Sequence, residues 1–199
     1  MESLTARAHE DLQYIRRTLD AAGRFTAVSG TGLVLTGAVA LGAVWLNQRV
    51  TGAPWEAPAA REAALLVWAG ALLAAVLIGL AGTLEKARRT GQVLWSPLLR
   101  RVLWGLCPTL LLGGIFTLSL IRSGRLDLLP AVWLGCYGAA VTAGGVMSVA
   151  PVRWMGVSFL ALGAVAALGA PSEGLRLLAL GFGFLHGAFG AYIAWRHDG

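Results

Sequence analysis

Residues 11–42 read DLQYIRRTLDAAGRFTAVSGTGLVLTGAVALG, and this stretch decides the class of the protein. In its first half, charged residues alternate with apolar ones. From Phe25 onward the stretch contains no charged residue. Because about 20 apolar residues in a helix cross the hydrocarbon core of a bilayer, we predict that the chain passes here from the membrane surface into the membrane.

The same uncharged pattern returns along the whole chain of 199 residues. Charged residues make up 13% of the sequence, against about 25% in an ordinary soluble domain. Uncharged runs of 19 to 25 residues occur six times. We therefore predict an all-α, polytopic membrane protein, since helices satisfy their own backbone polar groups in lipid. The six predicted transmembrane helices cover residues 25–46, 63–84, 102–121, 128–150, 154–170 and 177–195, within a transmembrane domain of residues 25–195.

Residues 1–24 are predicted to form a separate amphipathic helix before the first span. Apolar residues recur there at intervals of three or four, which places them on one face of a helix. Such a helix is expected to lie in the plane of the membrane interface. The alternative is that its apolar face packs on a partner subunit or on other cytosolic parts of the protein. The apolar face consists of Leu4, Ala8, Leu12, Ile15, Leu19 and Ala22.

The net charge of +6 has a topological explanation. Eleven of the sixteen lysines and arginines lie on one predicted side of the membrane, and five lie on the other. The positive-inside rule then places both termini in the cytoplasm, with residues 196–199 as a short tail. Since the arginines flank apolar spans, membrane lipids are the expected partners and nucleic acid is not. The predicted lipid-headgroup contacts are Arg16, Arg17, Arg24, Lys86, Arg88, Arg89, Arg100 and Arg101.

The longest connection between spans on this side is residues 85–101, which is basic at both ends. Pro97 is expected to interrupt any helix there. The segment is therefore predicted to lie at the interface, against anionic lipid. The two cysteines, Cys107 and Cys136, fall at different depths in their spans, on the order of 10 Å apart. They are predicted to remain free rather than to form a disulfide.

Small residues supply the predicted contacts between helices. Of the 27 glycines, several are spaced four residues from another small residue in spans 1, 4 and 6. Small residues allow close approach of helices where lipid provides no hydrophobic drive, so a packing role is expected, with span 1 against span 6. The glycines assigned to helix packing are Gly32, Gly42, Gly135, Gly144, Gly183, Gly187 and Gly190.

His186 is the strongly titratable residue predicted to lie deep in a span. A histidine at this depth is costly unless it is hydrogen-bonded, so it marks a candidate ligand-binding or proton site together with Tyr137 and Thr142 of span 4. Three interpretations stay open: a neutral histidine that locks the bundle through a hydrogen bond, a ligand or proton site, and a haem ligand. Further candidate partners are Ser148, Thr36 and Ser119.

Catalytic motifs are not found. A serine protease would need Ser29 beside His186, but their predicted depths differ. His9 and His197 lie outside the spans, so paired haem ligands are not expected. The sequence has no HExxH motif, no Cys/His cluster and no phosphate-binding glycine loop. No carboxylate occurs inside a span, which argues against ion-coupled transport. We assign no catalytic residue, metal site or cofactor, and we expect no enzymatic activity.

Two segments, one near each end of the chain, are similar to segments of a known group of membrane proteins. Residues 11–32 and 181–199, together with the spacing of the six spans, resemble a family of uncharacterised bacterial inner-membrane proteins. Its members look similar in an amphipathic N-terminus, an FTAV-x-G start of the first span, a histidine in the last span and a basic C-terminal tail. The resemblance implies a bacterial cytoplasmic membrane, and it implies no particular activity.

Three functions are compatible with these patterns. The leading hypothesis is a membrane scaffold, accessory or regulatory subunit that binds lipid, another membrane protein or a second copy of itself. It rests on the lack of buried acids and cofactor motifs and on the glycine-rich faces. The first alternative is a small transporter or channel for a neutral or lipophilic solute, with His186 in the pathway. The second is a haem- or quinone-binding redox subunit.

Overall fold

A computed structural model describes residues 11, 12, 14, 15, 28–51, 61–90 and 96–197 of the chain. Within these residues, six helical segments are long and apolar enough to cross a membrane. The prediction of an all-α, multi-pass membrane protein is therefore confirmed. The amphipathic helix predicted over residues 1–24 lies almost entirely outside the described residues, and it stays a prediction.

The first five spans are single helices and the last is composite. The first five are α2 (Gly30–Thr51), α3 (Arg61–Thr90), α4 (Pro97–Ser123), α5 (Leu129–Gly145), which follows the 3-10 turn η2 (Leu126–Leu128), and α6 (Ala150–Leu168). The last span follows the 3-10 turn η3 (Pro171–Glu173) and joins α7 (Gly174–Leu178), the π-helix η4 (Ala179–Leu185) and α8 (His186–His197).

Local capping explains where two of the spans begin. The Ser29 hydroxyl accepts a hydrogen bond from the Gly32 N–H (3.1 Å), and α2 starts at Gly30. Ser96 caps α4 in the same way, through the Leu99 N–H (3.1 Å). Side-chain oxygens at this position satisfy N–H groups that have no partner within the helix.

Pro97 is the first residue of α4 and Ser96 before it has an extended backbone, so no helix runs into this proline from the N-terminal side, as predicted. A proline in the first turn costs nothing there, because its missing N–H would have no partner within the helix anyway. The predicted interfacial segment, residues 85–101, is instead largely two helix ends. Its first part belongs to α3 and its last part to α4, and residues 91–95 lie outside the described part of the chain.

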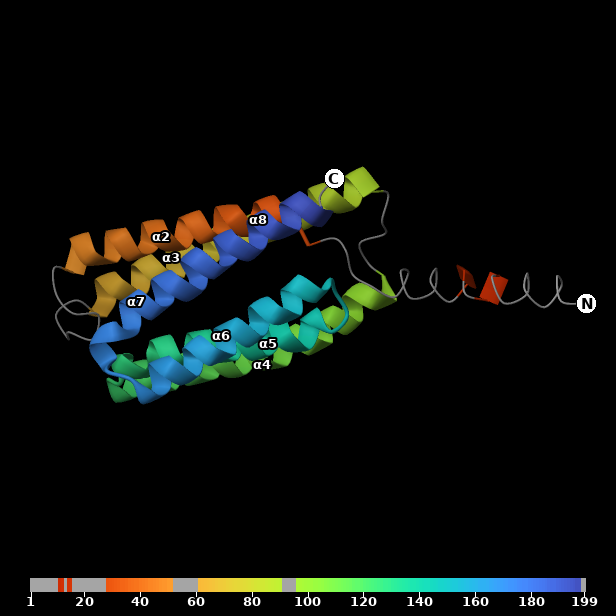
Figure 1. Ribbon diagram of the computed structural model, residues 1–199. Coiled ribbons are helices and arrows are strands. Elements are labelled where there is room, and N and C mark those ends of the chain that lie inside the picture. Colours follow the sequence, from red (N-terminus) through yellow and green to blue (C-terminus); the bar gives the residue numbers. More distant parts are fainter. Residues whose placement is uncertain (1–10, 13, 16–27, 52–60, 91–95, 198–199) are drawn as a thin grey trace, which may run out of the picture.

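The spans form two units of three helices (Figure 1). One unit contains α2, α3 and the composite last span, and the other contains α4, α5 and α6. Short links explain the second unit, because they make successive helices antiparallel neighbours. The last span returns to pack against α2 and so closes the first unit.

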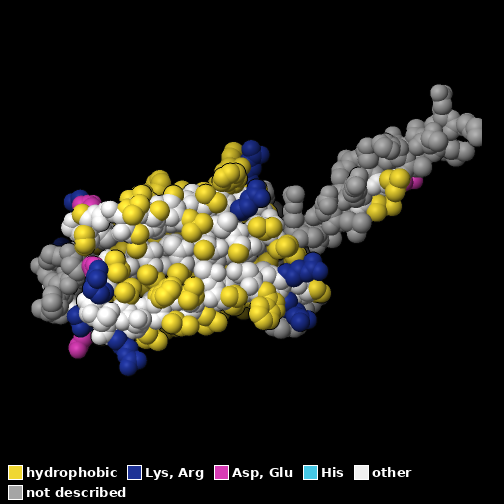
Figure 2. Space-filling view, turned by 90° about the horizontal axis from the view of Figure 1, so that it is seen from below, with side chains coloured by type: hydrophobic (Ala, Val, Ile, Leu, Met, Phe, Trp, Pro, Cys, Tyr) yellow, Lys and Arg dark blue, Asp and Glu magenta, His cyan; other side chains and the backbone are white. Residues whose placement is uncertain are grey.

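Apolar side chains cover the flank of the bundle, and charged side chains gather at its two ends (Figure 2). Leu66 on α3 is 74% exposed and Leu111 on α4 is 68% exposed. Patches of this extent are rare on soluble monomers. They fit a surface that is solvated by lipid tails.

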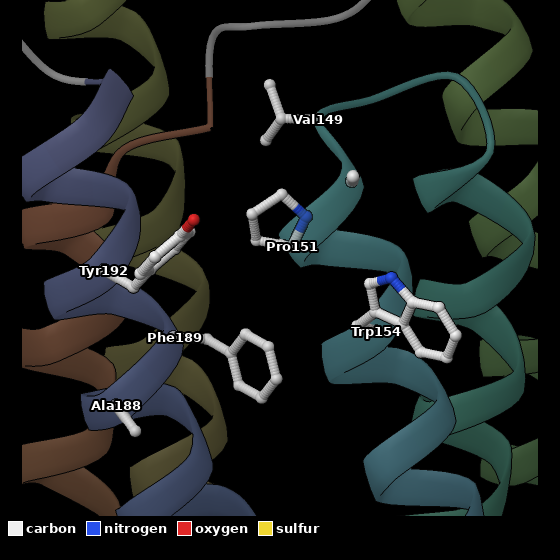
Figure 3. A pocket seen from close by; sticks show the side chains of 7 residues that line it. Val149, Pro151, Trp154, Ala188, Phe189 and Tyr192 are labelled. Carbon is white, nitrogen blue, oxygen red and sulfur yellow. The ribbon is translucent and has the colours of Figure 1, made fainter.

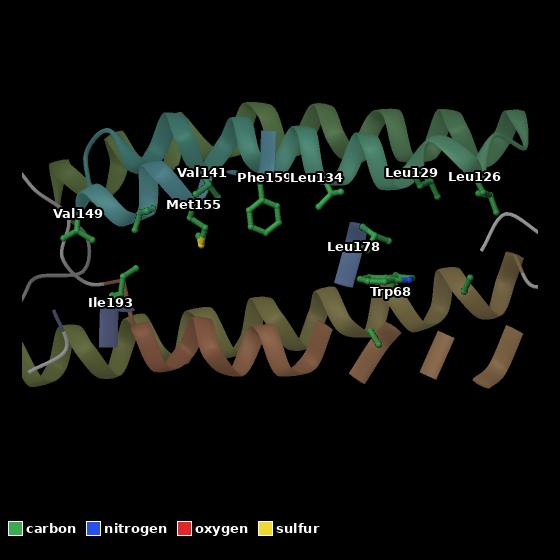
Figure 4. Packing of buried hydrophobic residues seen from close by; sticks show 13 residues of the cluster. Trp68, Leu126, Leu129, Leu134, Val141, Val149, Met155, Phe159, Leu178 and Ile193 are labelled. Atoms are coloured by element: carbon green, nitrogen blue, oxygen red, sulfur yellow. The ribbon is translucent and has the colours of Figure 1, made fainter. Parts of the chain in front are cut away.

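Buried apolar side chains from both units meet in the seam between them (Figure 4). Trp68 of α3 contacts Trp133 of α5, with ring centroids 5.8 Å apart. Leu134 and Phe159 come from the α4–α6 unit, and Leu178 comes from α7. Each of these last three side chains is fully buried. This seam is the core of the protein.

Within each unit, glycines bring helix backbones into direct contact. A Cβ added at Gly190 would lie 2.7 Å from the Val34 nitrogen of α2, and one at Gly37 would lie 2.9 Å from the Gly187 nitrogen. In the other unit, a Cβ at Gly138 of α5 would meet the Gly156 carbonyl of α6 at 2.9 Å. Span 1 therefore packs on span 6 through glycine, as small-residue packing in membranes requires.

The glycines assigned to packing from the sequence divide into three groups. Gly183, Gly190, Gly144 and Gly32 lie against neighbouring helices, and a Cβ at Gly32 would meet Ser29 of its own segment at 3.3 Å as well as the Ile78 carbonyl of α3 at 3.8 Å. Gly187 and Gly135 form the surface that another glycine approaches, since Cβ atoms added at Gly37 and Gly163 would strike their backbones. A Cβ at Gly42 would meet no described atom within 4 Å, so the packing role assigned to Gly42 is not found.

We expect Gly190→Ala to lower the free energy of unfolding by about 1–3 kcal/mol, because the new methyl group forces two backbones apart. Gly187→Ala is the matched control, since its Cβ enters open space among the described residues. The control should be neutral or stabilising by up to about 1 kcal/mol, from helix propensity. Denaturant titration in detergent micelles, followed by tryptophan fluorescence, measures both. Equal effects of the two substitutions would contradict the packing assigned here.

Candidate functional site

His186 lies in the seam, at the junction of the π-helix η4 and α8. Its side chain is 2% exposed. Three aromatic residues surround it: Tyr137 from α5, Phe159 from α6 and Phe182 from η4. The site therefore joins the last span to two helices of the other unit.

Both ring nitrogens of His186 have hydrogen-bond partners. Nε2 lies 2.7 Å from the Tyr137 hydroxyl oxygen, and Nδ1 lies 3.1 Å from the Phe182 carbonyl oxygen. A carbonyl can only accept, so Nδ1 carries the proton. In the neutral ring Nε2 is then an acceptor, and the Tyr137 hydroxyl donates to it. One neutral tautomer thus satisfies every polar atom of the pair.

The aromatic rings pack around this hydrogen bond. Tyr137 lies 4.8 Å from Phe159 and 5.3 Å from Phe182, centroid to centroid, in edge-to-face geometry. Phe182 stacks on the His186 ring at 6.0 Å with an interplanar angle of 16°. Such pairs are worth about 0.5–1.5 kcal/mol each beyond the area they bury. The rings bury the His186 side chain, while Tyr137 and Phe182 are themselves only partly buried, and they hold the imidazole in one orientation.

The π-helix sets the direction in which His186 points. Its wider turn changes the register between α7 and α8, and segments of this kind are frequent at functional sites. Two buried glycines in it face opposite units: a Cβ at Gly181 would clash with Leu134 of α5, and one at Gly183 would clash with Leu41 of α2. The segment can therefore touch both units at once while presenting Phe182 and His186 to the seam.

Of the two partners predicted for His186, the structure brings Tyr137 to the histidine. Thr142 instead donates its hydroxyl to the Gly138 carbonyl of its own helix (2.7 Å). A Cβ at Gly156 would also lie 2.5 Å from the Thr142 hydroxyl oxygen, so Thr142 belongs to the α5–α6 contact. Ser29 caps α2 and lies against Gly82 of α3. A serine–histidine pair is therefore not assembled from Ser29 and His186.

The predicted headgroup residues have several placements. Arg88, Arg100 and Arg101 are exposed. Arg89 pairs with Glu85 at 2.7 Å, and Lys86 donates to the Val28 carbonyl at 3.1 Å, which ties α3 to the segment before α2. Arg16, Arg17 and Arg24 lie outside the described residues.

Asn47 is a buried polar residue that the sequence analysis missed. It is fully buried on α2, and neither its amide nitrogen nor its amide oxygen has a hydrogen-bond partner in the described structure. The first span was predicted to end at residue 46, which placed Asn47 in a loop, whereas α2 continues to Thr51. Buried groups without partners cost about 1–3 kcal/mol each. Asn47 is thus a second polar site within the bundle.

Other candidate chemistry is sparse in the described part of the chain. Cys107 and Cys136 are both free, as predicted. No group of three or more His, Cys, Asp and Glu residues is placed to hold a metal ion among the described residues. No protein-family model, curated protein or solved structure matches the chain. The resemblance to a bacterial family of six-span proteins accordingly stays a prediction, and the six spans are what the structure supports.

We expect Tyr137→Phe to lower the free energy of unfolding by about 1–2 kcal/mol, because Nε2 of His186 loses its donor in a buried site. Tyr192→Phe is the control, since Tyr192 is 45% exposed on α8. Denaturant titration in micelles compares the two variants. The His186→Phe/Tyr137→Phe double variant should lose less than the sum of the single changes, since the two side chains act as a pair. Strict additivity would show that the hydrogen bond is not formed.

Proposed function

We propose that the protein is a membrane scaffold or accessory subunit that binds another membrane protein or a second copy of itself through α3 and α4. The observation that carries this proposal is the isolation of α4. Of its 27 residues, Val102 and Gly113 are buried within the described structure, and its main neighbour is α5. An outer helix with so little packing of its own has a long face available for a partner.

On both helices, exposed apolar side chains recur at intervals that place them on one face, as in helix–helix contacts. On α4, Leu111, Ile115 and Leu118 recur at intervals of four and three residues and are each more than 60% exposed. On α3, Leu66 and Leu73 lie seven residues apart on one face. Lipid tails solvate such faces equally well, so membrane lipid is the competing occupant.

The polar core supports a structural role for His186. Both of its ring nitrogens are engaged, and aromatic rings enclose the pair. A haem iron or a quinone oxygen at Nε2 would first have to displace the Tyr137 hydroxyl. Burying a charge in hydrocarbon is costly, and the neutral His186–Tyr137 pair avoids this cost because it needs no counter-ion.

A transporter or channel for a neutral or lipophilic solute is the second candidate. The division into two three-helix units favours it, because opposed helical units can move against each other around a central site. In that mechanism the His186–Tyr137 bond would close the seam near its middle. The bond would have to break whenever the seam opens.

We expect a partner to be extracted from the membrane together with the protein, in fixed stoichiometry. Extraction in native lipid with a polymer, followed by native mass spectrometry, measures the composition. Leu111→Trp/Leu118→Trp should remove the partner, because the bulkier rings disturb the α4 face. Leu168→Trp on α6 is the control, since Leu168 is 90% exposed on a different helix. A monomer that carries lipid alone contradicts the proposal.

Glycerol uptake into proteoliposomes gives a second test. If the protein carries glycerol, and if Tyr137→Phe changes the rate of uptake, the scaffold proposal is contradicted and the transporter is favoured.

We further propose that the membrane is the bacterial cytoplasmic membrane, with both termini in the cytoplasm. From residue 28 onward, the bundle end that carries the start of α2 and the end of α8 has one described acidic residue, Glu85, beside seven basic ones. The opposite end has three acidic and five basic residues in the same part of the chain. The seven basic residues are Lys86, Arg88, Arg89, Arg100, Arg101, Arg153 and Arg196.

This orientation follows from the positive-inside rule. Green fluorescent protein fused after residue 199 should fluoresce in bacterial cells, whereas alkaline phosphatase fused at the same point should stay inactive. The reverse pair of results would invert the topology.

A further inference from the structure

A groove opens between the start of α6 and the end of α8, where the two units separate (Figure 3). Its volume is about 690 Å³. Trp154 and Tyr192 stand on opposite walls, with Pro151 and Phe189 between them. The other lining residues are Val149, Ala150 and Ala188.

The groove has the polarity of a site for an amphiphile. Apart from the Tyr192 hydroxyl and the Trp154 N–H, its lining side chains are apolar. Tryptophan and tyrosine at the ends of spans mark the level of the lipid headgroups. Phe189 and Ala188 lie deeper on α8 by up to one turn. An occupant would therefore place its apolar part against Phe189 and Pro151 and its polar part beyond Tyr192.

Two arginines lie close in sequence to residues that line the groove, although neither is itself a lining residue. The Arg153 guanidinium is 5.8 Å from the centre of the Trp154 ring. Arg196 follows Tyr192 by four residues, so it lies one turn further along the same face of α8, and its guanidinium is 5.0 Å from the Trp195 ring. In the described part of the chain neither arginine pairs with a carboxylate, whereas at the opposite end Arg125 pairs with Asp127 and Arg176 with Glu173, both at 3.0 Å.

We propose that this groove binds an anionic diacyl phospholipid, with an acyl chain along Phe189 and Pro151 and the phosphate between Arg153 and Arg196. The volume falls within the range of about 300–1,000 Å³ that is typical of small-ligand sites. Basic residues beside a pocket between transmembrane helices attract anionic headgroups. The site involves neither α3 nor α4, so it does not depend on the proposed scaffold function.

Lipid retention by the full-length protein tests this proposal. The protein is reconstituted in nanodiscs of phosphatidylcholine with increasing phosphatidylglycerol, and native mass spectrometry after release into detergent counts the lipids retained. We expect one phosphatidylglycerol to be retained in preference to phosphatidylcholine. Arg153→Gln/Arg196→Gln should weaken this retention by about tenfold or more, since each arginine near the surface contributes about 1 kcal/mol toward an anionic lipid.

Matched variants separate the site from general electrostatics. Arg49→Gln/Arg122→Gln removes the same charge at the opposite end, and Arg49 also lies over a tryptophan ring, that of Trp45 at 5.4 Å. This control should keep the retained lipid. Ala188→Trp fills the groove and should remove both kinds of lipid. If that variant does not fold, phosphatidylglycerol with a diazirine in its acyl chain should label residues 150–154 and 188–192 of the unaltered protein.

Four results would overturn the proposal. The first is equal retention of phosphatidylglycerol and phosphatidylcholine by the unaltered protein. The second is an equal loss in the two double arginine variants, which would indicate bulk attraction. The third is displacement of the lipid by inorganic phosphate at millimolar concentration, which would leave the apolar groove without a role. The fourth is photolabelling confined to α3 and α4.

Discussion

The last span has to pack on two units at once, and the rest of the structure depends on how it does so. One of its faces is glycine, and it lies against the backbone of α2 through Gly183, Gly187 and Gly190. Another face carries Phe182 and His186 and lies against Tyr137 and Phe159. Both faces lie on η4 and α8, where their residues recur at intervals of three or four. The π-helix η4 changes the register of these residues relative to α7, whose Leu178 is also buried in the seam.

Burial in a membrane protein makes a polar group costly unless it has a hydrogen-bond partner. The His186–Tyr137 pair meets this condition, because a single tautomer satisfies both side chains and aromatic rings pack around them. Asn47 does not, because its amide is buried without a partner in the described structure. Such a group lowers the stability of the folded state. Asn47 is therefore a buried polar group on α2 that the packing of the described residues does not satisfy.

Sequence reasoning could locate the spans because the hydrocarbon thickness imposes a length and excludes charge. It could also select His186 and Tyr137, since polar side chains at mid-depth need each other. It could not choose the packing faces. Gly37, Gly138 and Gly156 carry closer helix contacts than Gly42, yet nothing in their spacing distinguishes them, because the contact face is fixed by the arrangement of all six helices. The π-helix has no sequence signal of its own. Pro97 marked a helix break but not the start of α4, because the same proline that breaks a helix interior is favourable in a first turn.

The distribution of close contacts along the seam bears on whether the two units can separate. Away from the groove the seam is closed: Trp68 meets Trp133, a Cβ at Gly174 would lie 2.8 Å from the Pro130 ring, and Gly181 lies against Leu134. In the middle, the His186–Tyr137 hydrogen bond and the aromatic rings around it join the two units. At the remaining end a groove opens beside Pro151 and Phe189, while Ile193 of α8 stays fully buried in the core cluster. Opening the whole seam would break the aromatic, glycine and hydrogen-bonded contacts together, whereas filling the groove breaks none of them. A seam closed over most of its described length, with a groove at one end that can hold a lipid, favours a rigid scaffold over an alternating pathway.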